Sequence, residues 1–221
     1  MGSDRIYRHF CMGARALEVV GDRWSLLIVR DLLLGPRRFT DLVRGLNEIT
    51  PTRLTGRLRQ LEAAGLVVRD PSQPGREVWY GLTDAGRALE PVIDALSLWG
   101  IENAREGPVA GEPVGPEPVM MGTKVLLNRD APEAADGLTW VWRFPDEDDF
   151  TLRFDSGQWR LSRGREDGAA VTVVGAPRAW ATFITTPPRR RRLPSKDIRL
   201  EGSRAELRRF AKAFAAKLAP K

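Results

Sequence analysis

The sequence of 221 residues predicts an α+β protein of two domains. Three observations support this prediction. Apolar residues recur at helical spacing through much of the first hundred residues, a stretch rich in proline and glycine follows, and apolar and polar residues then alternate as they do in β-strands. We therefore expect domains at residues 1–106 and 119–221, joined by a semi-extended linker at 107–118 that holds no helix or strand.

Capping residues and stop signals predict four helices in the first domain, at residues 5–20, 23–34, 40–46 and 51–64. Gly21 can end the first helix in the left-handed conformation, and Asp22 can cap the second. The second helix is apolar on most sides and ends at a Gly-Pro pair, so we expect it to be the buried centre of the domain. Thr50 and Pro51 open the fourth helix as a capping hydroxyl and a proline in the first turn.

A hairpin and a long helix complete the first domain. Two runs rich in β-branched and aromatic residues, 66–70 and 77–82, are separated by the turn-rich sequence PSQPGR. Thr83 then caps a helix predicted over residues 83–103, whose apolar stripe consists of Leu89, Ile93, Leu96 and Trp99. Helices followed by a two-stranded hairpin and a flanking helix predict a winged helix-turn-helix.

The fourth helix, residues 51–64, is the element that we expect to enter DNA. Its leucines share one side and must face the core, so arginine, glutamine and threonine take the other side. Arg and Gln side chains can bond base edges in the major groove, while hydroxyls and helix amides can bond phosphates. The predicted DNA-binding residues are Arg37, Arg38, Thr50, Thr52, Arg53, Arg57, Arg59, Gln60 and Arg76. The alternative interpretation is a polar helix face that is merely solvated.

Composition limits the other classes of function. The net charge of +6 favours a polyanionic partner, and the basic excess of the first domain is local to residues 37–59, where six arginines face two acidic residues. One cysteine excludes an internal disulfide, and one histidine leaves no metal site, no catalytic constellation and no cofactor motif. We expect a protein that is not an enzyme. Without an apolar run long enough to span a membrane, and without a secretory signal, we expect it to be cytoplasmic.

Alternation predicts a sheet in residues 119–221, with strands around 138–144, 150–154, 159–161 and 170–174. Two helices are expected beside it, the last with Leu207, Phe210 and Phe214 on one stripe. The candidates for lining an apolar ligand pocket are Trp140, Trp142, Phe150, Phe154, Trp159, Trp180 and Phe183. The alternative interpretation is that these rings fill a plain core. The run Arg189–Arg192 is expected to be a solvated loop, or else a contact for DNA phosphates or an anionic effector.

Residues from about 8 to 101 resemble the HxlR family of bacterial transcriptional regulators. The resemblance lies in Cys11, in Gly21 with Trp24, in residues 35–39, in the leucines of the fourth helix, in Tyr80-Gly81-Leu82-Thr83 and in Trp99-Gly100. It implies a homodimer formed by the first helix and the helix 83–103, bound to an inverted repeat in double-stranded DNA. Cys11 matches a cysteine that senses oxidants in some family members. Met12 replaces the usual proline, and inert packing of Cys11 is the alternative.

The second domain resembles a sterol carrier protein in the order of its elements. The likeness is strongest in VTVVGAPRAWATFIT and IRLEGSRAELRRFAKAF, and it implies an apolar cavity between sheet and helices. Together the two resemblances predict a homodimeric regulator modulated by a small apolar ligand. The alternative is a carrier or sensor of a hydrophobic molecule in which the winged domain serves mainly for dimerisation.

Overall fold

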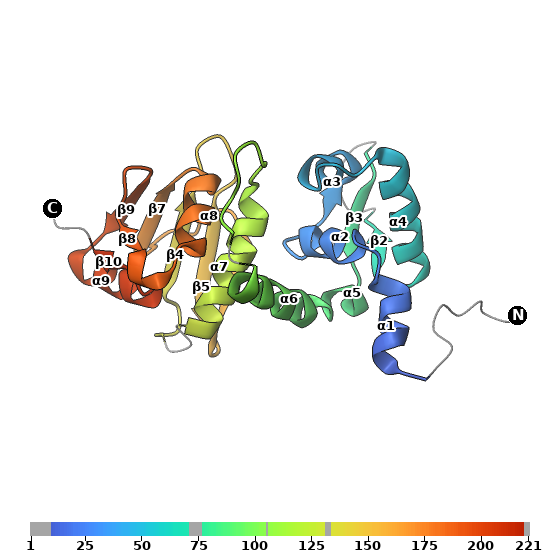
Figure 1. Ribbon diagram of the computed structural model, residues 1–221, viewed down its shortest axis with the longest axis horizontal. Coiled ribbons are helices and arrows are strands. Elements are labelled where there is room, and N and C mark those ends of the chain that lie inside the picture. The colour runs from blue at the N-terminus through green and yellow to red at the C-terminus, as the bar shows by residue number, and fades with distance from the viewer. Residues whose placement is uncertain (1–9, 71–76, 105, 131–133, 219–221) are drawn as a thin grey trace, which may run out of the picture. The chain divides into compact units, whose positions relative to one another are not determined.

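The computed structural model describes residues 10–70, 77–104, 106–130 and 134–218, and these form two compact units (Figure 1). The first unit ends at Ile93 and the second begins at Asp94. The boundary between the compact units therefore falls inside a helix, ahead of the Pro- and Gly-rich segment at 107–118. No described helix combines the length and the apolarity that a bilayer crossing requires.

The first unit is built from helices around a small three-stranded sheet. Its elements are α1 (Met12–Val20), α2 (Ser25–Leu32), β1 (Arg37–Arg38), α3 (Phe39–Gly45), α4 (Pro51–Ala63), β2 (Val67–Arg69), β3 (Trp79–Leu82) and α5 (Asp84–Arg87). The strands lie in the order β1-β3-β2, and both pairings are antiparallel. A helix-turn-helix followed by a β-hairpin is the predicted winged arrangement, and it positions α4 with one face free.

The core of this unit forms where α2, α3 and α4 meet the sheet. Ile28, Val29 and Leu32 on α2 are fully buried, as expected for the most apolar helix of the domain. Gly86 in α5 lies against the backbone carbonyl of Leu66, so close that a side chain at this position would collide with it. Glycine is therefore required for α5 to pack on the start of the hairpin.

Several sequence predictions for this unit need correction. Gly21 ends α1 in the right-handed conformation, with φ −72°, and not in the left-handed one. The predicted helix 83–103 is interrupted: α5 ends at Arg87 and α6 (Glu90–Asn103) begins after two turn residues. The physical reason is Pro91, which has no N–H to donate to Arg87 and so breaks the helix before it. The short helix expected from Thr40 begins one residue earlier, and strand β1 before it was not predicted. The first helix was expected from residue 5; α1 begins at Met12, and residues 1–9 lie outside the described part of the chain.

The second unit combines a five-stranded sheet with helices. It contains most of α6, from Asp94 onward, and then α7 (Pro116–Asp130), β4 (Thr139–Arg143), β5 (Phe150–Asp155), β6 (Gln158–Arg163), β7 (Val171–Gly175), α8 (Pro177–Thr185), the 3-10 turn η1 (Pro188–Arg190), β8 (Arg192–Leu193), β9 (Ile198–Gly202), α9 (Arg204–Ala213) and β10 (Lys217–Leu218). The sheet order is β6-β5-β4-β7-β9, with β4 and β7 parallel and the other neighbours antiparallel. The predicted strands and the last two helices are confirmed. The sterol-carrier resemblance stays a prediction.

Helix α7 was not predicted. Its first turn holds Pro116 and Pro118, which made this stretch look like the end of a linker; only residues 107–115 lack helix and strand. Prolines are tolerated in a first turn because the amides there have no helical partner. The helix protects the sheet edge: the side-chain amide of Asn128 accepts from the backbone N–H of Trp159 at 2.7 Å and donates to its carbonyl at 3.2 Å. It thereby satisfies both backbone groups of one residue at the open edge of β6.

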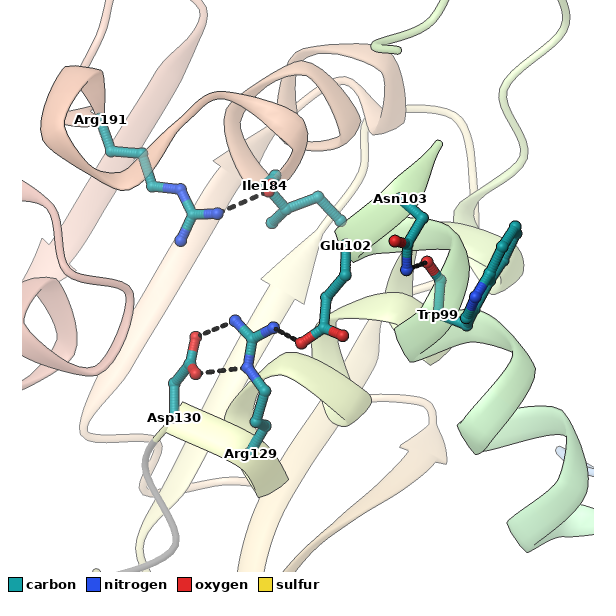
Figure 2. A network of polar contacts seen from close by, with 7 residues as sticks. All are labelled: Trp99, Glu102, Asn103, Arg129, Asp130, Ile184 and Arg191. Carbon is teal, nitrogen blue, oxygen red and sulfur yellow. Dashed lines mark hydrogen bonds and ion pairs between the residues drawn. The ribbon is translucent and has the colours of Figure 1, made fainter. Parts of the chain in front are cut away.

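The arginine run 189–192 differs from the expected solvated loop at one residue. Arg191 is only 4% exposed, and its guanidinium donates to the backbone carbonyls of Ile184, Thr186 and Phe214 at 2.7–2.9 Å (Figure 2 shows the bond to Ile184). These carbonyls lie at the C-terminal ends of α8 and α9, which attract a cation. Burial lowers the pKa of Arg191 from its ordinary value. Arg191 therefore holds the ends of two helices together.

Candidate nucleic-acid interface

Helix α4 is fixed in the first unit by its inner face and its first turn. Leu54, Leu58 and Leu61 are at most 1% exposed and lie in the core. The hydroxyl of Thr50 accepts a hydrogen bond from the backbone N–H of Arg53 at 3.3 Å, so Thr50 caps the helix as predicted. Its own O–H remains a donor that can reach a phosphate.

The outer face of α4 presents the predicted base-reading side chains to solvent. Thr52, Arg53, Arg59 and Gln60 are all exposed. Within the described residues, neither Arg53 nor Arg59 has a carboxylate within ion-pairing distance. Between them lies Gly56, where a Cβ would meet no atom within 4 Å. In the described residues the face therefore offers two guanidinium groups without a carboxylate partner, an amide and a hydroxyl, grouped around a glycine that adds no side chain.

Arg57, at the border of this face, is held inside the protein. One of its guanidinium nitrogens lies 2.7 Å from a carboxylate oxygen of Asp22, which stands at the start of the α2 segment. Both side chains are about four-fifths buried. Asp22 also accepts a hydrogen bond from the backbone N–H of Trp24. Arg57 is thus part of the support that orients α4, and it can contact DNA only if a phosphate replaces Asp22.

The base of the wing holds two more predicted contacts. Arg38 on β1 pairs with Glu77 at 2.8 Å, and its guanidinium stacks over the ring of Trp79 at 4.8 Å from the centroid. Arg37, its neighbour, is half-buried and opposite Tyr80 in the sheet. Arg76 lies outside the described residues. The strand that holds Arg37 and Arg38 was not predicted from the sequence, and neither was Glu77 as the partner of Arg38 or Asp22 as the partner of Arg57.

A buried carboxyl group lies where α2 packs against α3. Asp31 on α2 is 9% exposed and binds the guanidinium of Arg30 at 2.8–2.9 Å. Its carboxylate also packs against Gly45 of α3, where a Cβ would come within 3.3 Å of it. Burial raises the pKa of Asp31, and the neighbouring Arg30 opposes that rise. This carboxyl is therefore a titratable group at the packing contact between α2 and α3.

The elements predicted to form a dimer expose large apolar side chains. On α1 and the residues before it these are Phe10, Met12, Leu17 and Val19, and on α6 they are Val92, Leu96 and Trp99. The three on α6 follow one another at helical spacing and so form a stripe. Cys11, which precedes α1, is a free and exposed thiol.

The seven predicted ligand-binding residues are brought together in the second unit, and all are buried. Trp140 stacks on Trp159 at 4.4 Å between ring centroids, and Trp180 stacks on Phe183 at 4.7 Å. Trp142 meets Trp180 edge to face. The predicted set of pocket residues did not include Phe210 of α9 or Phe214, which follows α9. Their rings pack directly on those of Trp140 and Trp142. The contacts among these rings are those of a packed core.

Comparison with known proteins places the first unit in a wider group. A family model described as HxlR-like helix-turn-helix matches residues 19–107. The chain is 39% identical over 90 residues to the HTH-type transcriptional regulator YvaP of Bacillus subtilis. The aligned residues make up 40% of this chain and 82% of that protein. It is 50% identical over 90 residues to the HTH-type regulator Rv3095 of Mycobacterium tuberculosis, covering 40% of this chain.

This chain spans only 56% of the length of the mycobacterial relative. Among solved structures, the oxidised form of the redox regulator HypR is similar to it, with 36% identity and a TM-score of 0.40 over 42% of this chain and 97% of that one. The family model and these relatives cover the first part of the chain, and the sheet-rich second unit lies almost wholly beyond it.

Proposed function

The chain belongs to the HxlR-like helix-turn-helix family, and we propose that it is a homodimeric transcriptional regulator that reads duplex DNA through the outer face of α4. The observation that supports this most is the contrast between the two sides of the helix. Three leucines are buried on one side, and on the other Arg53 and Arg59 are exposed without an acidic partner in the described residues. A surface helix without a polyanionic partner does not need unpaired arginines beside Gln60.

In this proposal the side chains of α4 divide into two roles. Arg53 and Arg59 donate pairs of hydrogen bonds to guanine edges, and Gln60 bonds adenine. Thr50, Thr52 and the first-turn amides bind phosphates and fix the register. Arg38 and Arg57 start from ion pairs with Glu77 and Asp22, so they contribute by exchanging a carboxylate for a phosphate. Each exchange gains less than a free arginine would.

Dimerisation is proposed through the exposed apolar residues of α1 and α6. Burying Leu96 and Trp99, which are 55% and 61% exposed, would remove apolar surface from water. A two-fold dimer would present two copies of α4 to successive major grooves about 34 Å apart. The proposed operator is therefore an inverted repeat.

Modulation by a small apolar ligand remains a separate part of the proposal. The aromatic rings of the second unit already contact one another, so a ligand between sheet and helices would have to separate them. The indole N–H groups of Trp140 and Trp142 are buried without a hydrogen-bond partner in the described residues. A ligand carrying an oxygen acceptor would satisfy them, and this favours such a ligand over a pure hydrocarbon. Sensing of oxidants through the exposed Cys11 likewise stays a hypothesis.

The direct test is the affinity of the full-length protein for the intergenic DNA upstream of its own gene. We expect this DNA to bind roughly a thousandfold or more tightly than a scrambled duplex at physiological salt. The double variant Arg53→Ala/Arg59→Ala should lose most of that ratio, whereas Arg87→Ala, an exposed arginine on α5, should retain it. Equal binding of both duplexes by the unmodified protein would contradict the proposal and favour the carrier alternative.

A further inference from the structure

The positive charge of the chain is concentrated near its C-terminus. Residues 189–217 contain eleven Lys and Arg against three Asp and Glu, a net charge of +8. The rest of the chain holds 24 basic and 26 acidic residues, a net charge of −2. The basic character of the protein therefore comes from this segment, which lies outside the helix-turn-helix.

The fold gathers this segment at one end of the second unit. Strands β8 and β10 pair in parallel, which places Arg192 directly beside Lys217. Helix α9 packs against β9 and β10, and β8 contacts β9, as Figure 1 shows at the C-terminal end of the chain. The buried guanidinium of Arg191 fixes the arginine run to the end of α9 through the carbonyl of Phe214. The neighbouring arginines are thereby held in place while they remain exposed.

Most cations at this end have no acidic partner. Arg199 and Arg209 are paired with Glu201 and Glu206, at 3.4 and 3.6 Å. The other exposed cations, which we call the basic end, have no carboxylate within 4 Å in the described part of the chain: Arg189, Arg190, Arg192, Lys196, Arg204, Arg208, Lys212 and Lys217. Like charges crowded in this way repel one another, and a polyanion bound across them would relieve that repulsion.

The chemistry of the basic end favours duplex DNA over other polyanions. The large apolar side chains exposed in the described residues all lie between Phe10 and Val109, so the basic end offers no aromatic ring on which a single-stranded base could stack and no apolar wedge for a membrane. Five of its eight cations are arginines, whose guanidinium groups match phosphate. The first unit carries the proposed DNA-reading helix in the same chain, which keeps the local concentration of DNA high.

We propose that the basic end binds the phosphate backbone of duplex DNA that flanks the operator. This inference rests on the proposed function, because it takes the DNA from the first unit, but it concerns a different surface and a different kind of contact. The basic end adds affinity without reading sequence, since phosphate contacts carry no base information.

The test measures how DNA affinity depends on salt. Fluorescence anisotropy of a labelled random-sequence duplex of about 60 base pairs gives the Kd of the full-length protein over a salt series. The variant Arg204→Gln/Arg208→Gln/Lys212→Gln removes three exposed cations from one side of α9. Its slope of log affinity against log salt should be shallower by roughly 2–3, about 0.9 for each lost phosphate contact. A slope equal to that of the unmodified protein would overturn the inference.

A matched control separates local contact from net charge. Arg153→Gln/Arg160→Gln/Arg165→Gln changes the charge equally but lies on and beside β5 and β6, at the other edge of the sheet from β9. It should keep the slope of the unmodified protein, and an equal loss of slope in both variants would also overturn the inference. Binding to anionic phosphatidylglycerol vesicles or to poly(U) that the α9 substitutions abolish, with an unchanged slope on duplex DNA, would instead assign the surface to a membrane or RNA.

The same variants keep this inference distinguishable from the proposed function. If the unmodified protein shows no preference for its upstream DNA, the proposed function fails, whereas the slope on random duplex still decides whether the basic end binds backbone. If the preference is present and the α9 variant keeps both the preference and the slope, only the present inference fails.

Discussion

Helix α4 of the first unit and helix α9 of the second are built on one plan but present different chemistry to solvent. Each begins with a hydroxyl cap, Thr50 or Ser203, and each buries apolar side chains on its inner face. The outer face of α4 mixes arginine with glutamine and threonine around a glycine, whereas that of α9 is dominated by cations. A mixed face offers amide and hydroxyl groups beside its guanidinium groups and can discriminate among base edges, whereas a face dominated by cations favours the phosphate backbone.

Single arginines of the molecule also differ in their surroundings. Arg53 and Arg59 are exposed without an acidic partner in the described residues, Arg57 is held by Asp22, and Arg191 is buried against backbone carbonyls. The same side chain is thus exposed to solvent on α4, supports α4 from its border, and ties two helix ends together in the second unit. What distinguishes them is the set of atoms around each guanidinium, and substitutions can measure that difference.

The largest expected effect is on stability, from Arg191. Replacing it with methionine leaves the carbonyls of Ile184, Thr186 and Phe214 buried without their donor, which costs roughly 3 kcal/mol or more. Arg190→Met, at an exposed neighbour, should cost under about 0.5 kcal/mol. Urea unfolding followed by tryptophan fluorescence measures both, because four buried indoles lie in the second unit. Similar losses in the two variants would show that Arg191 is not the tie between α8 and α9.

The next effect is on sequence recognition, from Arg53. Replacing Arg53 with alanine should remove about 1–3 kcal/mol of discrimination between the upstream DNA and single-base variants of it. Arg57→Ala should act differently, because it breaks the ion pair with Asp22 and therefore lowers stability as well as affinity. Competition binding combined with thermal unfolding separates the two. An Arg53→Ala protein with unchanged base preference would break the assignment of base reading to this residue.

A smaller effect is expected at Gly56, where one substitution should raise stability but lower DNA affinity. Alanine there meets no atom within 4 Å, so it should stabilise α4 by up to about 1 kcal/mol through helix propensity. If α4 lies close to the groove floor at this point, the added methyl group should weaken binding to the upstream DNA. A Gly56→Ala protein that is more stable and binds DNA as well as the original would show that Gly56 does not lie against the DNA.

The smallest effect concerns the pH dependence of the first unit. Because the folded pKa of Asp31 is raised above its ordinary value of 3.8, the folded chain holds more protons than the unfolded chain between those two pH values. Stability should therefore fall as pH rises through that interval, and Asp31→Asn should not show this fall. Hydrogen exchange of α2, with variant and original protein compared at each pH, measures the difference. A constant difference across the acidic range would contradict the role of this carboxyl.

Most of the first unit, including helix α4, could be predicted from the sequence because the signals there are local. The leucine spacing and the cap of α4 lie within fifteen residues, and the HxlR resemblance predicted for residues 8–101 is confirmed from residue 19 onward by the family model, which matches residues 19–107. Alternation likewise predicted the strands β4, β5, β6 and β7 of the second unit. The acidic partners of Arg38 and Arg57, and the bond from Arg191 to Phe214, could not be predicted, since each depends on how distant segments meet in the fold.

Two errors have a common physical cause. Pro116 and Pro118 suggested a linker because proline usually excludes helix, although in a first turn it is allowed, and Pro91 was accepted inside a helix that it in fact interrupts. In both cases the position of the proline within its helix decides the outcome. The presence of a proline in the sequence does not by itself show which position it takes in a helix.

The most direct measurement of the account compares two variants on two duplexes. For Arg53→Ala/Arg59→Ala and for the triple α9 variant, affinity is measured on the upstream DNA and on a scrambled duplex of equal length, across a salt series. We predict that the α4 variant loses most of the affinity ratio between the duplexes, while the α9 variant keeps that ratio and shows a shallower salt dependence on both duplexes. If the α4 variant keeps the ratio, or the α9 variant loses it, the division between a reading helix and a backbone-binding helix is wrong.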